Sequence, residues 1–538
     1  MVYQDRYGVK ITKTGGTIFM GRRCRFDHVG LVILLSLSGL LFTSSALAFD
    51  ADEPANGDAK SIYKQAKKED RKGRFDSAEK LYRRVLELDP KFSDAKLDLA
   101  YMLSKRHFVR DAYDLSFDVA KNEPNNPRAY AVLGIALLTA GNFEDARRCF
   151  DKALTLTRKE DLAWAGMGLL DFYENRIEYS LANLEQAVYR EPTQPDYLFA
   201  LGQIAARAER YQESAEAYRR FLSVSNVLDT DRRERIKGLI NFLTFLGTKT
   251  SLYSSSGAEQ TNVPFKLIGN RPVVQVRLNN SEVPLNFVLD TGSGISVISD
   301  TTAKRLGIGR ITRGGFARGI GGDGRFEIVY GFLREVSIGD VEIRNVPVYI
   351  RKFHTTSESI DGYIGLSLIS KFLTTIDYGD LTFDLAKKGT IATAENAENK
   401  VSLPLRLTSS GFLSGEVRLQ GIDNPLNFIV DTGASVSVIS EDLAGLDEVS
   451  RYVQKGKMRV IGSAGITEDV LSFTLPRVTF GNHSRESVSA IALDLDLINE
   501  ASGFQQAGIL GGNFLRNYRL TFDFKNSKVI FVPIVEQK

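Results

Sequence analysis

Residues 284–299 read PLNFVLDTGSGISVIS, and residues 425–440 repeat them almost unchanged as PLNFIVDTGASVSVIS. The two segments are identical at eleven of sixteen positions, and their aspartates, Asp290 and Asp431, lie 141 residues apart. In each copy an apolar strand ends in Asp-Thr-Gly, which places a carboxylate on a tight glycine turn. Two such carboxylates facing each other can share one proton and activate a water molecule. The duplication therefore predicts one active site built from two homologous halves.

The composition argues against several other classes of site. The chain has 538 residues, 43% of them hydrophobic and 25% charged, and its net charge of +3 gives no reason to expect a nucleic-acid partner. Its two cysteines, Cys24 and Cys149, lie in different regions, so they form no disulfide framework or thiolate metal cluster. The four histidines are scattered without ligand spacing. We therefore expect no metal, no cofactor and no nucleic acid.

The N-terminus has the features of an export signal. Three arginines at positions 22, 23 and 25 precede an apolar run, and a small-x-small triplet ends at Ala48. This pattern predicts a secretory signal peptide over residues 1–48. An uncleaved membrane anchor over residues 29–49 is the alternative. In both cases the positive flank leaves the rest of the chain periplasmic or extracellular, and the protein contacts the membrane only if the segment stays uncleaved.

Residues 60–246 are predicted to be helical and repetitive. Gly134, Gly168 and Gly202 follow one another at 34-residue steps, and small residues keep the same step at positions 78, 112, 146, 180 and 214. Such a period resembles the tetratricopeptide repeats, here about five of them, with a helix over residues 232–245 as a cap. No helical hairpin of this kind buries its apolar stripe alone, so neighbours stack into a solenoid. The resemblance implies a surface for a protein partner, and a spacer or self-association module is the alternative.

After residue 262 the pattern becomes all-β, with short β-branched runs between Gly and Asn turns. Residues 247–262 are polar and Ser-rich and predict a linker, as do residues 386–400. We therefore expect one lobe over residues 263–385 and a second over residues 401–538. The predicted strands are residues 273–278, 286–289, 326–329, 335–338 and 348–350 in the first lobe and residues 415–419, 427–430, 459–461 and 470–473 in the second.

Two further motifs at matched places make both lobes resemble the aspartic proteases, specifically their small retropepsin-like branch. A glycine-rich segment follows each aspartate, and an apolar-apolar-Gly motif comes later in each lobe. In this family the first is a flap that closes over the substrate, and the second passes behind the catalytic loop. The flap candidates are Gly319, Ile320, Gly321, Gly322, Ile461, Gly462 and Gly465, and the apolar-Gly motifs contain Ile364, Gly365, Leu510 and Gly511.

The resemblance also implies a role for each residue of the duplicated loops. Asp290 and Asp431 would form a catalytic dyad in which one carboxyl stays protonated while the other takes a proton from water. The threonines would brace one loop against the other through their hydroxyls, and the glycines would permit the turn. The residues supporting the dyad are then Thr291, Gly292, Ser293, Thr432, Gly433 and Ala434.

The sequence thus predicts an exported aspartic endopeptidase: an all-α tetratricopeptide solenoid followed by two all-β retropepsin-like lobes. The solenoid would recruit a polypeptide substrate or a partner protein. The alternative from another class is a non-catalytic peptide-binding scaffold with degenerate lobes. A variant of the same chemistry pairs each lobe with its counterpart in a second chain, which gives two dyads instead of one.

Overall fold

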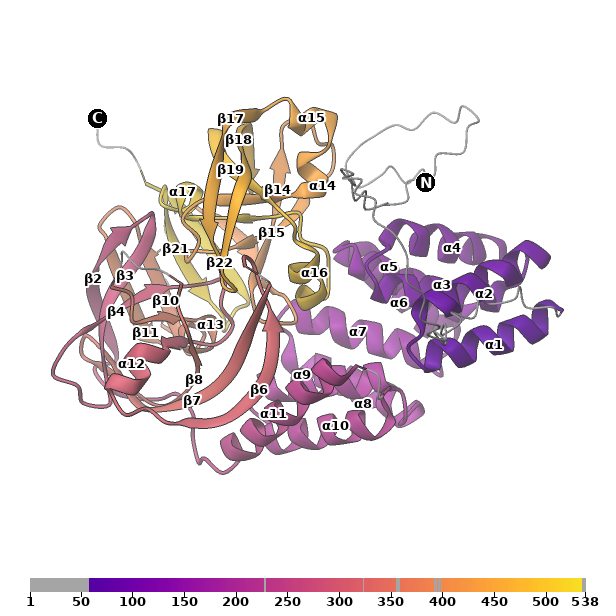
Figure 1. Cartoon of the computed structure of the whole chain (residues 1–538), viewed down its shortest axis with the longest axis horizontal. Helices are drawn as coiled ribbons and strands as arrows, with labels where there is room; N and C mark the ends of the chain where they lie inside the picture. The colour runs from indigo at the N-terminus through magenta and orange to yellow at the C-terminus, as the bar shows by residue number, and fades with distance from the viewer. Residues whose placement is uncertain are drawn as a thin grey trace, which may run out of the picture.

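The chain folds into a helical half and a β-rich half (Figure 1). The computed structural model describes residues 58–226, 229–322, 324–354, 359–390, 394, 397 and 399–534. The predicted signal peptide and the alternative anchor therefore lie outside the described residues. Among the residues described, no helix is long and apolar enough to cross a membrane.

The helical half is a solenoid of antiparallel helix pairs, which confirms the fold class predicted from the 34-residue period. In the described part of residues 58–246 the helices are α1 (Ala59–Arg71), α2 (Phe75–Leu88), α3 (Ser93–Lys105), α4 (Val109–Asn122), α5 (Pro127–Thr139), α6 (Phe143–Leu156), α7 (Asp161–Tyr173), α8 (Ile177–Arg190), α9 (Pro195–Arg207), α10 (Tyr211–Val224) and α11 (Thr230–Leu246). The last of these is the helix predicted over residues 232–245.

The periodic small residues lie where the two helices of a pair touch. A Cβ atom added at Gly134 would come within 2.5 Å of the Phe150 ring, and one at Gly202 within 2.9 Å of the Tyr218 ring. Ser214 is fully buried, and its hydroxyl donates to the carbonyl oxygen of Gly202 at 2.7 Å. The repeat keeps small side chains at these positions because the helices cross too closely for larger ones.

The solenoid winds tightly enough for distant repeats to touch. Lys105 on α3 forms an ion pair with Asp196 on α9 at 3.2 Å, and the hydroxyl of Tyr101 donates to the same carboxylate at 2.8 Å. The side-chain amide of Asn226 donates to the carbonyl oxygen of Lys72, so the segment after α10 meets the turn between α1 and α2. Polar side chains of the solenoid itself therefore bridge across it.

The β-rich half consists of two lobes with a similar succession of elements, to which the second lobe adds two short helices. The first contains β1 (Ser254–Gly257), β2 (Gln260–Ile268), β3 (Arg271–Leu278), β4 (Leu285–Leu289), β5 (Val297–Ser299), α12 (Asp300–Arg305), β6 (Arg310–Arg318), β7 (Arg325–Ile338), β8 (Val341–Arg351), β9 (Gly362–Ile364), α13 (Leu366–Ile369), β10 (Phe372–Asp377) and β11 (Thr382–Lys387). The second contains β12 (Val401–Pro404), β13 (Arg406–Leu407), β14 (Leu413–Leu419), β15 (Leu426–Val430), β16 (Ser437–Ser440), α14 (Glu441–Ala444), α15 (Asp447–Ser450), β17 (Val453–Ile461), β18 (Ile466–Phe480), β19 (His483–Leu493), α16 (Asp496–Ser502), β20 (Gly508–Leu510), α17 (Gly512–Leu515), β21 (Tyr518–Asp523) and β22 (Lys528–Pro533).

A shared sheet joins the two lobes. Its strands follow the order β12-β22-β21-β10-β11-β2, in which β10 of the first lobe pairs antiparallel with β21 of the second. Thr375 and Thr521, opposite each other on these strands, hydrogen-bond through their hydroxyls at 2.9 Å. One apolar cluster runs through both lobes and includes Ile376, Phe383, Leu520 and Phe522. The lobes are therefore held together by backbone hydrogen bonds and by a common core.

The structure differs from the predicted β elements in two places. Residues 247–262, expected as a linker, contain β1, which pairs with β8, and the first residues of β2. The separate strands expected over residues 326–329 and 335–338 form one continuous strand, β7. Gly331 lies inside this strand and makes room for Ile350, since an added Cβ would lie 2.8 Å from that side chain.

The last helix of the solenoid packs on the first lobe. Phe242 on α11 stacks against Tyr330 of β7, with their ring centroids 4.3 Å apart. A Cβ atom added at Gly238 would lie 2.2 Å from the carbonyl oxygen of Arg313 on β6, so this glycine permits the close approach of α11. Figure 1 shows α11 beside the long curved strands β6 and β7. The solenoid thus supports the β6–β7 hairpin directly.

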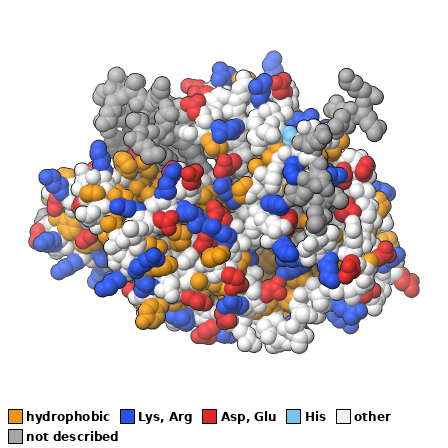
Figure 2. Space-filling view, turned by 180° about the vertical axis from the view of Figure 1, so that it is seen from behind, with side chains coloured by type: hydrophobic (Ala, Val, Ile, Leu, Met, Phe, Trp, Pro, Cys, Tyr) orange, Lys and Arg blue, Asp and Glu red, His pale blue; other side chains and the backbone are white. Residues whose placement is uncertain are grey.

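Charges of both signs are mixed over the surface. Figure 2 shows Lys and Arg side chains interspersed with Asp and Glu side chains over the face seen from behind. That face has no continuous basic stripe of the kind that follows a nucleic-acid backbone.

Candidate active site

The two aspartates occupy equivalent places at the ends of two buried strands. Asp290 follows β4 and Asp431 follows β15. The backbone N–H of Asp290 donates to the carbonyl oxygen of Ile364 at 3.0 Å, and that of Asp431 donates to the carbonyl oxygen of Leu510 at 2.9 Å. In each lobe a parallel strand, β9 or β20, supplies this acceptor. The apolar-Gly motifs therefore hold the aspartates at the strand ends.

Two buried threonines lock the loops together across the lobes. The hydroxyl of Thr291 donates to the carbonyl oxygen of Val430 at 2.6 Å and accepts from the backbone N–H of Thr432 at 3.1 Å. The hydroxyl of Thr432 donates to the carbonyl oxygen of Leu289 at 2.7 Å and accepts from the backbone N–H of Thr291 at 3.2 Å. Neither side chain is exposed. This reciprocal set of four hydrogen bonds fixes the distance between the two loops.

The carboxyl groups of the two aspartates hydrogen-bond each other within one chain. Each carboxyl also accepts a hydrogen bond from the backbone of the glycine two residues further along the chain. Gly292 N–H donates to Asp290 Oδ1 at 3.0 Å, and Gly433 N–H donates to Asp431 Oδ1 at 2.7 Å. A Cβ atom at Gly292 would lie 2.4 Å from Cγ of Asp431, and one at Gly433 would lie 2.7 Å from Cγ of Asp290. Only glycine leaves room for the opposite carboxyl at these positions.

The electrostatics of the pair favour one shared proton. Burial raises the pKa of Asp290 well above its usual range, and the charge of Asp431 and the hydrogen bond that the protonated Asp290 carboxyl donates to Asp431 raise it further. Burial also raises the pKa of Asp431, while hydrogen bonds from the Gly433 N–H, from Asp290 and from neighbouring backbone groups oppose this rise. Two carboxylates this close cannot both ionise cheaply. Asp290 and Asp431 are both half-buried residues, so the site keeps some contact with solvent.

The residues after the two DTG triplets are fixed by the apolar-Gly loops. The carbonyl oxygen of Ser293 accepts from Leu366 N–H at 2.8 Å, and that of Ala434 accepts from Gly512 N–H at 2.7 Å. A Cβ atom at Gly365 would lie 2.7 Å from the same Ser293 oxygen. The equivalent atom at Gly511 would lie 2.6 Å from the backbone of Val436. These contacts explain why both apolar-apolar motifs end in glycine.

The two glycine-rich segments form the tips of two hairpins, and the tips meet. Residues 319–322 and 324 lie between β6 and β7, and residues 462–465 connect β17 to β18. The backbone N–H of Ala464 donates to the carbonyl oxygen of Ile320 at 2.8 Å, and that of Gly322 donates to the carbonyl oxygen of Ile466 at 3.1 Å. A Cβ atom at Gly321 would lie 2.3 Å from the Gly465 oxygen.

Each tip uses glycine both for space and for backbone conformation. Gly321, Gly322 and Gly465 all have positive φ angles, of 92°, 59° and 151°. A Cβ atom at Gly462 would lie 2.2 Å from the Ile320 oxygen, and one at Gly319 would lie 2.2 Å from the Ser463 hydroxyl. Ile461, at the end of β17, is about half exposed at 49%.

Residues 319–324 spell GIGGDG, which matches a dinucleotide fingerprint in letters alone. Their place at a hairpin tip between two antiparallel strands, with no helix following, excludes that interpretation. Among the described residues, no group of three or more His, Cys, Asp and Glu side chains could hold a metal ion.

The sequence analysis missed two serines that support the loops. The hydroxyl of Ser296 accepts from Gly365 N–H at 3.1 Å, and that of Ser437 accepts from Gly511 N–H at 3.1 Å. Both serines are buried. The signal was available, because they are identical residues at the same place in the two copies of the duplicated segment.

Comparison with known families covers both halves of the chain. Residues 274–368 and 415–514 match the aspartyl protease family model. Residues 63–106, 127–159 and 166–225 match tetratricopeptide repeat models. The chain is a tetratricopeptide-repeat protein fused to tandem retropepsin-like aspartyl protease domains. The two matched aspartyl protease segments contain both DTG triplets and both apolar-Gly motifs.

A search of curated proteins finds no match. Among solved structures, the chain is similar to a thermophilic TPR protein in Thermus thermophilus, at 21% identity and a TM-score of 0.30. This similarity covers 34% of the present chain and 98% of that one.

Proposed function

We propose that the chain is an aspartic endopeptidase in which Asp290 and Asp431 of one molecule activate a water molecule. The observation that carries the proposal is the hydrogen bond between the two carboxyl groups, in a site that keeps some contact with solvent. A purely structural carboxyl pair would need no exposure to water. The reciprocal hydrogen bonds of Thr291 and Thr432, which hold the pair rigid, support the same interpretation.

The proposed reaction moves two protons and forms no covalent enzyme intermediate. Asp290, whose pKa is raised further, is the protonated partner and donates to the oxygen of the scissile carbonyl. Asp431, ionised, takes a proton from the water as its oxygen attacks the carbonyl carbon. The tetrahedral intermediate then breaks its C–N bond as Asp431 passes that proton to the leaving nitrogen. Asp290 recovers its proton from the intermediate, so the dyad returns to its starting state.

The meeting hairpin tips would exclude bulk water from this step. They join the lobes through the Ala464–Ile320 and Gly322–Ile466 hydrogen bonds, so they must separate for a polypeptide to enter. Closing around the bound chain would strengthen the electrostatic interactions of the dyad.

The solenoid is proposed to bind the substrate protein or a partner that delivers it. Tetratricopeptide repeats generally mediate protein–protein interaction, and stacked repeats of this kind offer extended surfaces to other chains. A ligand on the inner surface would have to displace or use the bridge between Lys105 and Asp196. We further propose that residues 1–48 direct the chain across a membrane, which N-terminal sequencing of the mature protein would test.

The proposed activity is tested by incubating the full chain with a mixed peptide pool from pH 3 to pH 7, with and without pepstatin. Mass spectrometry should find internal cleavages that pepstatin abolishes and that the double variant Asp290→Asn/Asp431→Asn does not produce. Absence of cleavage at every pH, together with measurable peptide binding, would instead support the non-catalytic scaffold.

A further inference from the structure

The pairing registers of the strands superpose one lobe on the other residue by residue. Val273 pairs with Val288 in the first lobe, and Ser414 pairs with Ile429 in the second, both at the 141-residue offset of the duplicated motif. Further along, Ser299 pairs with Arg351, and its equivalent Ser440 pairs with Leu493. Arg351 and Leu493 therefore occupy equivalent positions on the two sides of the dyad.

The same register places Arg351 on the sheet face from which Asp290 projects. Directly opposite residues of neighbouring strands share a face, and so do residues two apart on one strand. Val288 precedes Asp290 by two positions and pairs with Tyr363, and Val297 pairs with both Tyr363 and Tyr349. Arg351 follows Tyr349 by two positions and so lies on this face.

Arg351 carries a positive charge that no carboxylate of the described residues neutralises. Its Nε atom is buried without a hydrogen-bond partner, and among the described residues no ion pair is found for its guanidinium. The guanidinium lies 4.9 Å from the ring centroid of Phe326, two residues beyond the flap tip at Gly324. Its positive charge also lowers the pKa of Asp290, against the larger raising effects of burial and of Asp431.

A buried guanidinium is costly unless it is paired, and stacking on an aromatic ring compensates only part of that cost. A carboxylate is the group that matches its planar fork of donors. Because the Arg351 guanidinium lies beside the Phe326 ring and its charge acts on Asp290, a carboxylate that reached it would belong to a chain bound in the active site.

The equivalent side of the second lobe is apolar. Leu493 belongs to a cluster with Ile509 and Leu495, and Ile320 from the opposite flap packs against it. Ile509 is the register equivalent of Tyr363, since it pairs with Ile429 as Tyr363 pairs with Val288. A third equivalent pair repeats the contrast: Arg271 begins β3 where the 141-residue offset places Phe412 in the second lobe.

We propose that the two sides of the active site select different side chains: Arg351 in the first lobe binds an Asp or Glu of the substrate, and the surface around Leu493 binds an apolar residue. The proposal rests on the proposed peptidase function and names its substrate class. A site assembled from two identical lobes would accept a peptide in either direction. Here the asymmetry fixes the direction, so the acidic residue falls on one constant side of the scissile bond.

The test uses the full chain and matched peptides that carry Glu, Gln, Leu or Lys at a single position, chosen after the first cleavage sites have been mapped. Wild type should cleave the Glu peptide with a kcat/KM at least about tenfold above that for the Gln peptide, since an ion pair to a buried partner is replaced by a neutral contact. In Arg351→Met the ratio of kcat/KM for the Glu peptide to that for the Gln peptide should fall to about one. In Arg351→Glu the Lys peptide should be cleaved faster than the Glu peptide. Arg351→Lys, which keeps the charge, should retain part of the preference.

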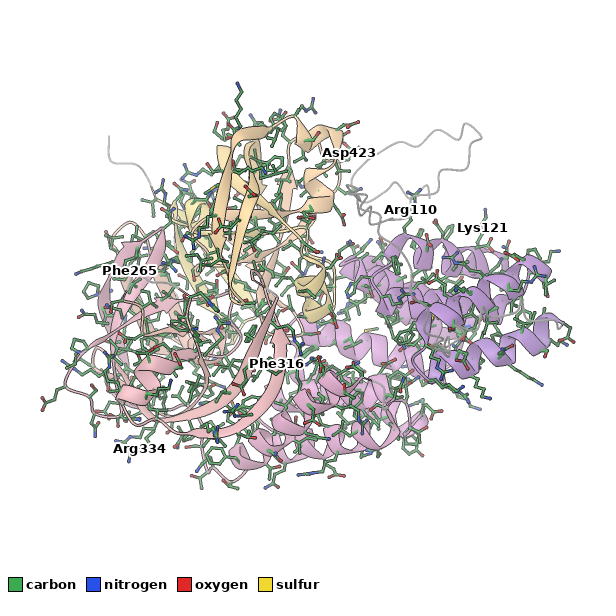
Figure 3. All side chains as sticks on the ribbon, viewed as in Figure 1. Arg110, Lys121, Phe265, Phe316, Arg334 and Asp423 are labelled. Carbon is green, nitrogen blue, oxygen red and sulfur yellow. The ribbon has the colours of Figure 1, made fainter. Side chains whose placement is uncertain are left out.

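Arg334→Met is the matched control. Arg334 is an exposed arginine of the same lobe, on the part of β7 remote from the flap tip, and Figure 3 shows it at the outer edge, away from Phe316. This variant should cleave as wild type does. A wild-type enzyme without preference for the acidic peptide, or a preference that survives in Arg351→Met, would overturn the inference while leaving the peptidase function intact.

A binding measurement separates the two proposals if no cleavage is found. Fluorescence anisotropy with labelled Glu and Gln peptides measures how tightly each peptide binds, and it requires no peptide cleavage. At least about tenfold tighter binding of the Glu peptide, lost in Arg351→Met, would support the inference, whereas equal affinities would overturn it.

Discussion

The reciprocal threonine contacts make a sharp prediction for Thr432→Val. Valine keeps the shape of threonine but removes the hydroxyl, which leaves the carbonyl oxygen of Leu289 and the backbone N–H of Thr291 without their partner. Both hydrogen bonds are buried, and Thr432 has no exposed surface. Each buried group left unpaired costs about 1–3 kcal/mol, so the variant should lose about 2–6 kcal/mol of unfolding free energy.

Urea unfolding of the full chain measures this loss, and peptide cleavage at 25 °C measures its effect on the dyad. Activity should fall strongly, because the loop that carries Asp290 is no longer held against the loop that carries Asp431. Thr432→Ser keeps both hydrogen bonds and removes one methyl group, so it should cost about 0.8 kcal/mol and keep most of the activity.

Thr374→Val is the control away from the loops. Thr374 is also fully buried, and its hydroxyl donates to the carbonyl oxygen of Ile369 at 3.0 Å. This variant should lose about 1–3 kcal/mol without a change in kcat. The reasoning fails if Thr432→Val unfolds within about 0.5 kcal/mol of wild type, or if Thr374→Val lowers kcat as much as Thr432→Val does.

Three further predictions concern the dyad and the support of the flap hairpin. The pKa of Asp290 is raised above its usual 3.8 in the folded state, so the folded chain binds more protons than the unfolded one and loses stability as pH rises through the raised value. Asp290→Asn should therefore raise the melting temperature more at pH 7 than at pH 4. An equal gain at both pH values would contradict this. Gly292→Ala should lower kcat at least about a hundredfold with a smaller effect on KM, because its Cβ would displace the Asp431 carboxyl. Steady-state kinetics measures both constants, and an unchanged kcat would contradict this prediction. Gly238→Val should separate α11 from β6 and make the flap hairpin more sensitive to limited proteolysis. The control Gly309→Ala should not, because its Cβ would enter open space. Equal sensitivity of the two variants would argue against support of the hairpin by α11.

Local patterns predicted the main features of the fold because their physical causes are local or repeated. The 34-residue step survives in sequence since each helix pair needs a small residue at the same crossing, as at Gly134 and Gly202. The duplicated DTG segment is recognisable because Thr291 and Thr432 must match each other to form the reciprocal hydrogen bonds.

Other features depend on distant parts of the chain and left no local signal. Gly331 stays inside β7 because Ile350, on a neighbouring strand, needs the space. The polar segment expected as a linker contains β1 because its residues pair with residues 341–344 of β8, which are distant in sequence. Arg351 belongs to no repeated motif, and its significance emerges only when the register places it opposite Leu493.

The central claim is that one molecule contains one dyad, and the activities of two single variants test it most directly. The rate of peptide cleavage should fall at least about a thousandfold in Asp290→Asn and equally in Asp431→Asn, because each removes one half of the same pair. Both variants should keep the wild-type circular dichroism spectrum. If either variant retained about half of the wild-type rate, each lobe would be pairing with its counterpart in a second chain, and the single-dyad account would be wrong.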